Sequence, residues 1–339
     1  MYNHLKSRTV DVIGAAFRHG QKHLGTEFGP EALRKGGLSD VIKNMNWNMN
    51  DKGDLKVENI QVDYCKDLSK YKYPNKIKNA EIVGSYNKHL SHLVKESADK
   101  RNFVLNLGGD HSVACGTISA LRKSYTGLKV IWIDAHADIN TPESTLSENY
   151  HGCPLGHLLG IAPKDSIPGF DWLDSCLDFK DIVYIGLRSV DIGEKKYLRD
   201  YNIKHFCMED VTELGIGNVM KQTFDYFNKN QINDNGHNNY PLHISFDIDG
   251  IDGQFIQQTG TVCRGGLTDR EAHHILRKSV QTGNLVSLDL VELNPLLGDE
   301  NAKLIRPNSH GDFSYIKGTQ TVCLSLELIQ SALGYRVCL

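Results

Sequence analysis

Short runs of β-branched and aliphatic residues recur along the chain, separated by longer stretches with apolar residues near helical spacing. Several runs are apolar at nearly every position, for example residues 130–133 and 182–185. Continuous apolar strands are typical of a parallel sheet that helices cover on both faces, because neither face of such a strand meets water. The pattern predicts eight strands, at 9–14, 59–63, 102–107, 129–134, 181–186, 203–206, 242–247 and 285–289.

Helices are expected at 77–100, 216–227, 268–282 and 321–333, and Thr268 with Glu271 makes a capping box at the start of the third. Alternating strands and helices predict either a doubly wound sheet or an eight-stranded barrel, and the pattern leaves both open. No repeat or Pro/Ser-rich linker divides the chain, so we expect one domain over residues 1–339. Two polar stretches, near 44–54 and 228–239, are expected to be surface insertions.

Composition excludes several classes of protein. The 38 basic and 41 acidic residues give a formal charge of −3 without a basic block, so we expect no nucleic-acid or anionic-membrane partner. No run of about 18 apolar residues predicts a membrane span. The first residues lack the pattern of a signal peptide, and the eight scattered cysteines form no CxxC pair. We therefore expect a cytoplasmic protein with reduced thiols.

Two segments at predicted strand ends carry residues able to bind metal. Gly108-Gly109-Asp110-His111-Ser112 follows the third strand, and the alternating Asp134, His136 and Asp138 close the fourth. The carboxyl ends of strands are where ligands bind in open α/β sheets. On an extended chain these three side chains would share one face and span about 13 Å, more than one ion readily bridges. Either the chain curls there, or two ions lie side by side.

A third segment, Asp247-Ile248-Asp249-Gly250-Ile251-Asp252, ends the seventh strand. It lacks the oxygen ligand, Gly and Glu that an EF-hand loop needs at its fifth, sixth and twelfth positions, so a calcium loop is excluded. Asp247 and Asp249 are expected to share a strand face, where their carboxylates would repel each other unless a cation lay between them.

The three segments together offer two imidazoles and four carboxylates without a thiolate. This set suits Mn²⁺ better than structural zinc, and two such ions can supply a hydroxide near neutral pH. The sequence therefore predicts a metal-dependent hydrolase whose candidate ligands are His111, Asp134, His136, Asp138, Asp247 and Asp249.

At these residues the sequence resembles the arginases of the ureohydrolase family, whose three metal motifs look like GGDHS, DAHADIN and SFDIDGID in the same order. The resemblance runs from residue 14 to the segment Glu292-Leu293-Asn294-Pro295. It implies a three-layer α/β/α sandwich with a central eight-stranded parallel sheet, in place of a barrel. It further implies hydrolysis of L-arginine to L-ornithine and urea by a hydroxide that bridges two Mn²⁺ ions.

The resemblance also assigns roles to individual residues. Glu292 matches the residue that pairs with the guanidinium, Asp138 could pass a proton to the leaving amine, and His151 matches a histidine that exchanges protons with solvent. The remaining matches are substrate contacts. They comprise Asn140, Thr145 and Ser147 at the α-carboxylate, Asp191 and Glu194 at the α-amino group, and Thr261 in the pocket.

Three positions depart from the family pattern. Ser189 stands where animal arginases commonly carry Asp, and two prolines are replaced at Gly253 and Val262. These departures keep open a hydrolase of agmatine or another guanidino compound. A catalytically silent paralogue and an amide deacetylase of related fold are weaker alternatives, because all six ligands and Glu292 are present. Arg270-Glu271 resembles a pair used at trimer interfaces, so the resemblance also implies a homotrimer.

Overall fold

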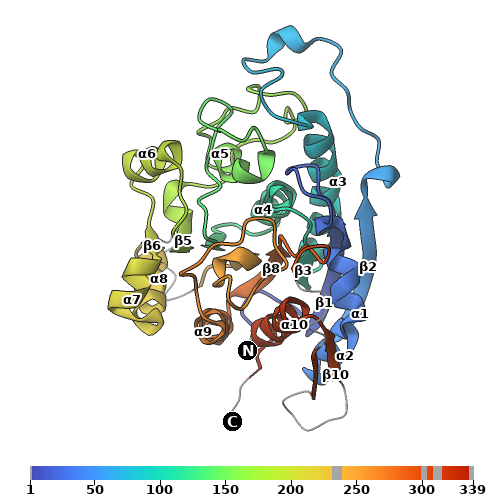
Figure 1. Cartoon of the computed structure of the whole chain (residues 1–339), viewed down its shortest axis with the longest axis vertical. Coiled ribbons are helices and arrows are strands. Elements are labelled where there is room, and N and C mark those ends of the chain that lie inside the picture. Colours follow the sequence, from blue (N-terminus) through green and yellow to red (C-terminus); the bar gives the residue numbers. More distant parts are fainter. Residues whose placement is uncertain (1, 231–238, 299–303, 308–314, 336–339) are drawn as a thin grey trace.

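The computed structural model describes residues 2–230, 239–298, 304–307 and 315–335. Its main sheet has eight parallel strands, as the resemblance implied, and their order is β2-β1-β3-β8-β7-β4-β5-β6 (Figure 1). The strands are β1 (Thr9–Ala16), β2 (Asn48–Lys56), β3 (Phe103–Leu107), β4 (Lys129–Ile133), β5 (Ile182–Leu187), β6 (His205–Cys207), β7 (Leu242–Asp247) and β8 (Leu285–Val291). A separate antiparallel pair comprises β9 (Leu304–Pro307) and β10 (Tyr315–Gly318).

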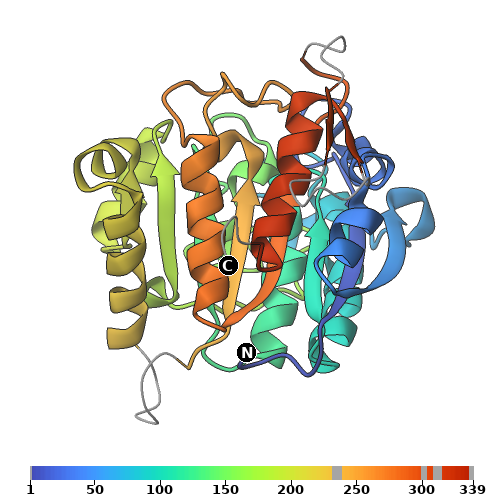
Figure 2. The ribbon, with the colours of Figure 1, turned by 90° about the horizontal axis from the view of Figure 1, so that it is seen from below.

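Helices cover both faces of this sheet and bury two hydrophobic cores. One core includes residues of α1 (Gly29–Lys35), α2 (Leu38–Asn44), α7 (Met208–Leu214), α8 (Ile216–Lys229), α9 (Asp269–Gln281) and α10 (Gln320–Ala332). The other includes residues of α3 (Ala80–Asp99), α4 (Ala114–Ser124), α5 (Pro154–Leu158) and α6 (Ile192–Asp200). Neighbouring strand residues alternate between the two cores, Val104 in one and Leu105 in the other. Figure 2 shows α9 in orange and α10 in red in front of the strands.

The predicted helices form close to their expected bounds, as α3, α8, α9 and α10. Thr268 and Glu271 make the predicted capping box at the start of α9. Short 3₁₀ turns lie between the larger elements: η1 (Thr26–Phe28), η2 (Val57–Asn59), η3 (Leu68–Lys70), η4 (His111–Val113), η5 (Tyr150–Gly152), η6 (Phe179–Asp181) and η7 (Ile248–Gly250).

The first edge of the sheet differs from the prediction. The stretch 44–54, expected as an insertion, supplies most of β2, whereas 59–63, expected as a strand, forms none. Strand β2 pairs in parallel with β1 from Asn48 opposite Thr9, and most of its residues are exposed. An edge strand buries little and often carries charges, so its polar pattern resembles that of a loop. Most of the second expected insertion, at 228–239, lies outside the described residues; 228 and 229 belong to α8.

The central four strands position the candidate site. In the order β3-β8-β7-β4 they lie side by side and run in one direction, so their carboxyl ends meet at one edge. Strands β3 and β4 follow each other in the chain yet flank β7 and β8, which is the kind of switch point where α/β sheets bind ligands. Within the described part of the chain, no helix has the length and apolar character needed to cross a bilayer.

Candidate active site

The first ligand segment turns sharply after β3. A Cβ atom on Gly109 would lie 1.8 Å from the carbonyl oxygen of Phe17, so only glycine fits there. The amide of Asp110 donates to the same carbonyl at 3.1 Å, and its carboxylate accepts from the amide of Gly20 at 2.8 Å. This turn presents the next residue, His111, to the strand ends.

The imidazole of His111 lies at the centre of a carboxylate cluster. Its Nδ1 is 3.1 Å from Asp134 Oδ2, 3.1 Å from Asp138 Oδ2 and 3.3 Å from Asp247 Oδ2. The ring stacks on Trp132 with centroids 4.0 Å apart, and its Nε2 lies 2.8 Å from the hydroxyl of Ser245. Stacking and this hydrogen bond fix the ring with Nδ1 toward the acids.

The second segment curls, which was one of the two arrangements its spacing allowed. Strand β4 ends at Ile133, and Asp138 has a left-handed backbone with φ of 49°. The curl brings Asp138 back to His111 although Asp134 already contacts that ring. A left-handed non-glycine residue at a ligand position is the kind of strain that functional sites hold.

The third segment also leaves the extended conformation. Asp247 caps the turn η7 by accepting from the amide of Asp249 at 2.8 Å, so the two residues do not share a strand face as expected. Asp249 instead meets the second histidine: Nδ1 of His136 lies 3.3 Å from Asp249 Oδ2 and 3.2 Å from Asp134 Oδ1.

Two groups of side chains that could hold a metal ion therefore form, and they share Asp134. The inner trio is His111, Asp134 and Asp247, all buried; the outer trio is Asp134, His136 and Asp249, with His136 partly exposed. Nδ1 of His111 is buried with three carboxylates around it and no well-aligned hydrogen bond. These donor sets fit divalent cations, because buried acids and an imidazole nitrogen facing one point need positive charge there.

The electrostatics of the cluster support this fit. Burial and the neighbouring Asp249 raise the pKa of Asp247 well above its usual range, and burial with Asp134 raises the pKa of Asp138 to about 6. Burial also opposes ionisation of Asp134, but the adjacent imidazoles of His111 and His136 outweigh it and lower the pKa of Asp134. The acids are crowded to a degree that a cation between them would relieve.

Glu292 joins the site from the end of β8. It is 1% exposed and has a left-handed backbone with φ of 64°. Its Oε1 accepts from the amide of His111 at 2.9 Å and from Nδ1 of His151 at 3.0 Å, whereas Oε2 is buried with no partner among the described residues. Burial lowers the pKa of His151, but the hydrogen bond to Glu292 outweighs it and raises that pKa to about 9. One carboxylate oxygen is thus free to receive a donor.

The loop after the second segment holds its predicted substrate residues by short-range hydrogen bonds. Asn140 donates to Asp191 Oδ2 at 3.3 Å and accepts from the hydroxyl of Ser144 at 2.8 Å. The hydroxyls of Thr145 and Ser147 accept from backbone amides at 3.2 and 3.3 Å. A hydroxyl that accepts such a bond keeps its own proton available for donation.

The predicted α-amino residues lie at the start of α6. Asp191 and Glu194 form a capping box there, and the carboxylate of Asp191 is near the surface. Both oxygens of Glu194 accept from backbone amides, of Asp191 at 2.9 Å and Ile139 at 3.3 Å, and burial raises the pKa of Glu194 to about 8. In the structure, Glu194 supports this loop, and Asp191 presents the more accessible acid.

Thr261 contacts a metal-ligating residue. Its hydroxyl donates to Asp249 Oδ2 at 2.6 Å, and its place in the substrate pocket, which the resemblance implied, stays a prediction. No role was assigned from the sequence to two residues that support the cluster, Ser245 beside His111 and Arg188 after β5. Ser245 could have been found, because it alternates with Asp247 along a predicted strand and so shares its face.

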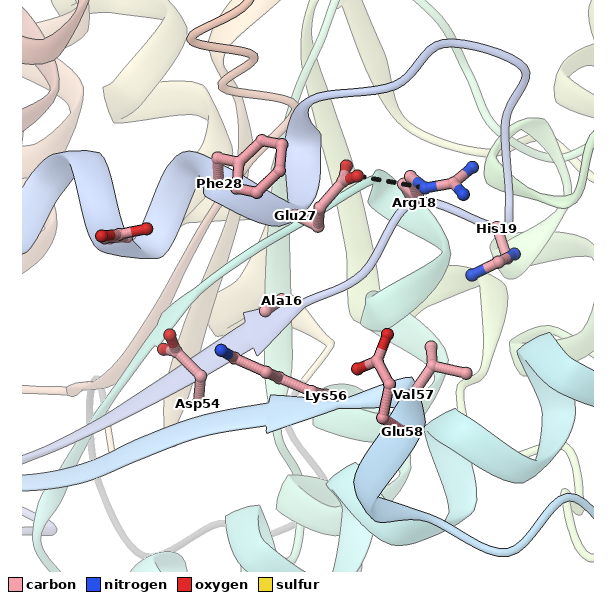
Figure 3. A pocket seen from close by; sticks show the side chains of 10 residues that line it. Ala16, Arg18, His19, Glu27, Phe28, Asp54, Lys56, Val57 and Glu58 are labelled. Carbon is pink, nitrogen blue, oxygen red and sulfur yellow. Dashed lines mark ion pairs between the residues drawn. The ribbon is translucent and has the colours of Figure 1, made fainter.

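A cavity of about 390 Å³ lies near segment 17–20, which holds Asp110 and His151 through the backbone of Gly20. Figure 3 shows its lining, with Arg18 paired to Glu27 at 3.0 Å and Lys56 and Glu58 facing them from β2 and the turn that follows. None of the predicted site residues lines this cavity, so it is separate from the ligand cluster.

Comparisons with known proteins identify the family of this chain. The model of the arginase family matches residues 8–331. Arginase-1 of Rattus norvegicus is 42% identical over 305 residues, covering 89% of each chain, and the arginase of Plasmodium berghei is 38% identical over 343 residues, covering 97% of this chain and 93% of its own. The structure of Entamoeba histolytica arginase in complex with L-ornithine superposes with a TM-score of 0.78 at 30% identity, covering 98% of this chain and all of the other. The chain belongs to the arginase family.

Proposed function

We propose that this protein is an arginase, which hydrolyses L-arginine to L-ornithine and urea. Relatives named arginase cover most of the chain, and one solved relative holds L-ornithine. The observation that carries the proposal in this chain is the buried Glu292 carboxylate beside the ligand cluster, whose Oε2 has no partner among the described residues. A buried acceptor of this kind is suited to a planar cationic group such as a guanidinium.

We assign one Mn²⁺ ion to each trio. Asp138 is a further candidate ligand, because its Oδ2 lies 3.1 Å from Nδ1 of His111. The set of carboxylates and imidazoles is harder than a typical zinc site, which favours manganese. When bound, such ions would lower the pKa of a coordinated water enough to supply hydroxide near neutral pH.

Glu292 orients the substrate in this proposal. Its Oε1 is fixed by the amide of His111, so the carboxylate cannot rotate freely, and its Oε2 can accept from the guanidinium. Holding the guanidinium carbon close to the ligand cluster turns the reaction into a positioned, effectively unimolecular step.

Two groups handle protons. Asp138, whose Oδ2 lies 3.1 Å from Nδ1 of His111 at the edge of the cluster, can accept a proton and give it to the leaving amine. His151 holds a proton at Nδ1 against Glu292 and is partly exposed, so it can exchange protons between the site and solvent.

The amino-acid end of arginine is assigned to the loop 140–147 and the start of α6. Asn140, Thr145 and Ser147 supply donors for the α-carboxylate, and Asp191 supplies an acid for the α-ammonium group. Ser189, which is exposed and bonded through its amide to Ala135, offers only a hydroxyl there. Agmatine lacks the α-carboxylate, so these donors favour arginine.

We further propose that residues 1–339 act as one cytoplasmic catalytic domain that takes part in arginine metabolism and assembles as a homotrimer. One continuous eight-stranded sheet is in keeping with a single domain. Arg270 is exposed at the start of α9 and is available to a neighbouring subunit, whereas Glu271 also caps that helix through Thr268.

The experiment that tests the function is urea release from L-arginine by Mn²⁺-loaded protein, with agmatine as the competing substrate. We expect urea from arginine, little from agmatine, and none from the Asp249→Ala variant. Preference for agmatine would overturn the substrate assignment. Absence of urea from the loaded wild-type protein would support a catalytically silent member of the family.

A further inference from the structure

Arg188 directly follows β5, and its guanidinium is surrounded by backbone carbonyls. Its Nη2 donates to the carbonyls of Asp249 at 2.6 Å, Cys263 at 3.0 Å and Ile251 at 3.2 Å. Its Nη1 donates to Gly186 and Gly250 at 3.1 and 3.2 Å, and its Nε to Arg264 at 3.2 Å. Among the described residues, no carboxylate lies within ion-pair distance of this side chain.

The main chain at the same position contacts a second ligand segment. The amides of Arg188 and Ser189 both donate to the carbonyl of Ala135, at 3.0 and 2.9 Å. Ala135 lies between Asp134 and His136, so this contact fixes the stretch that carries two members of the outer trio. The guanidinium fixes the turn that carries the third member, Asp249.

The same guanidinium also secures the loop that supports Asp249 from its other side. It binds the carbonyls of Cys263 and Arg264, and two residues before that contact Thr261 donates to Asp249 Oδ2 at 2.6 Å. Both the backbone and the carboxylate of Asp249 therefore depend on segments joined by Arg188.

The inner trio has different supports. His111 is held by Trp132 and Ser245, and Asp247 contacts His111 from the end of β7. Arg188 makes none of these contacts. The two metal positions of the proposed arginase site thus share Asp134 and are joined by the hydrogen bond from the amide of Asp249 to Asp247, but the guanidinium of Arg188 directly contacts only a member of the outer trio, through the carbonyl of Asp249.

We propose that Arg188 is a positioning residue that maintains the outer metal position, Asp134–His136–Asp249, and leaves the inner position largely unaffected. This inference rests on the proposed two-metal function. Only arginine suits the role, because its planar fork reaches several carbonyls at once, whereas a lysine ammonium acts from one point. Gly266 leaves room for the fork, since a Cβ there would lie 2.6 Å from Nη2.

The test measures Mn²⁺ per subunit and the affinity of each ion, by calorimetric titration of metal-free protein and elemental analysis after dialysis. The variants are Arg188→Lys, which keeps the charge and removes the fork, and Gly266→Ala, whose Cβ would crowd the guanidinium and also the backbone nitrogen of Asp252. Arg264→Lys is the matched control, because its side chain is exposed at a neighbouring position. Asp249→Ala is the reference for loss of the outer ion.

We expect wild type and Arg264→Lys to bind two ions. Arg188→Lys and Gly266→Ala should bind the first ion normally and the second about 10–100-fold more weakly, the usual cost of removing a group that orients a ligand. Unchanged affinity for both ions, or equal weakening of both, would overturn the inference. If Arg188→Lys does not fold, the Gly266→Ala result decides. Wild-type protein that binds fewer than two ions would instead overturn the proposed function.

Discussion

The metal-ligand cluster and the substrate loops were predicted from the same kind of motif match, yet their residues make different kinds of contact in the structure. The cluster residues follow three parallel strands of one sheet, β3, β4 and β7, and contact one another directly. The loop residues mostly satisfy nearby backbone amides and each other. The parallel order of the strands brings side chains at their carboxyl ends close together. The loop residues, in contrast, mainly make hydrogen bonds that stabilise the conformation of their own loop. Substitutions in the cluster should therefore affect catalysis as a whole, and those in the loops should affect specificity.

The largest effect is expected at Asp134, the residue common to both trios. The Asp134→Asn variant should lose both ions and lower urea formation by well over the 10–100-fold typical of residues that only orient ligands. Metal analysis and urea assays test this, with circular dichroism to verify folding. If Asp134→Asn retained two tightly bound ions, the shared-ligand arrangement would be wrong.

Glu292 should give the next largest effect without loss of metal. Glu292→Gln keeps the shape but removes the charge that pairs with a guanidinium, so kcat/KM for arginine should fall by about 100-fold, as expected for a misplaced reacting group. Metal content should remain at the wild-type value. Steady-state kinetics beside metal analysis separate the two effects, and parallel loss of both ions would assign Glu292 to metal binding.

A smaller and selective effect is expected in the loop, at Ser147. Ser147→Ala removes one donor to the α-carboxylate, and a hydrogen bond to a charged group contributes about 1.5–3 kcal/mol. The KM for arginine should rise by about 10-fold or more while turnover of agmatine stays unchanged. The exposed neighbour Leu146 provides the control variant Leu146→Ala. Equal losses on both substrates would contradict a carboxylate contact.

The smallest effect concerns stability, at His157, whose ring contacts Tyr150 and Ser166 and none of the candidate metal ligands. Its ring is buried between the hydroxyls of Tyr150 and Ser166, at 3.0 and 3.2 Å, and burial lowers its pKa from 6.5 to about 4. Between about pH 6.5 and pH 4, the unfolded chain binds a proton at His157 and the folded protein does not. The free energy of unfolding should therefore be highest above pH 6.5 and should decrease as the pH falls toward 4. In urea titrations of metal-free protein, His157→Gln should flatten the pH dependence of the unfolding free energy between these values; an unchanged slope would contradict the assignment.

Much of the fold could be predicted from residue patterns, because buried parallel strands and amphipathic helices have strong periodic signals. Seven of the eight predicted strand positions overlap the observed strands, and the four predicted helices form as α3, α8, α9 and α10. Strand β2 was missed because an exposed edge strand has few apolar residues, and 59–63 was misassigned because a short apolar alternation does not by itself secure a place in the sheet.

The sequence by itself determined the chemistry of this protein: which acids and imidazoles are present, that they follow strands, and that they match the arginase motifs. Only the tertiary structure decided how they meet. The carbonyl of Asp138, at the curl, accepts from the distant amide of Leu155, and the side chain of Arg188 joins the carbonyls of Asp249 and Cys263 to the end of β5. The sequence pattern predicts which side chains occur and how they are spaced along each element. It does not predict which backbone carbonyl lies within hydrogen-bond distance of which donor, because that depends on how distant segments pack in the folded protein.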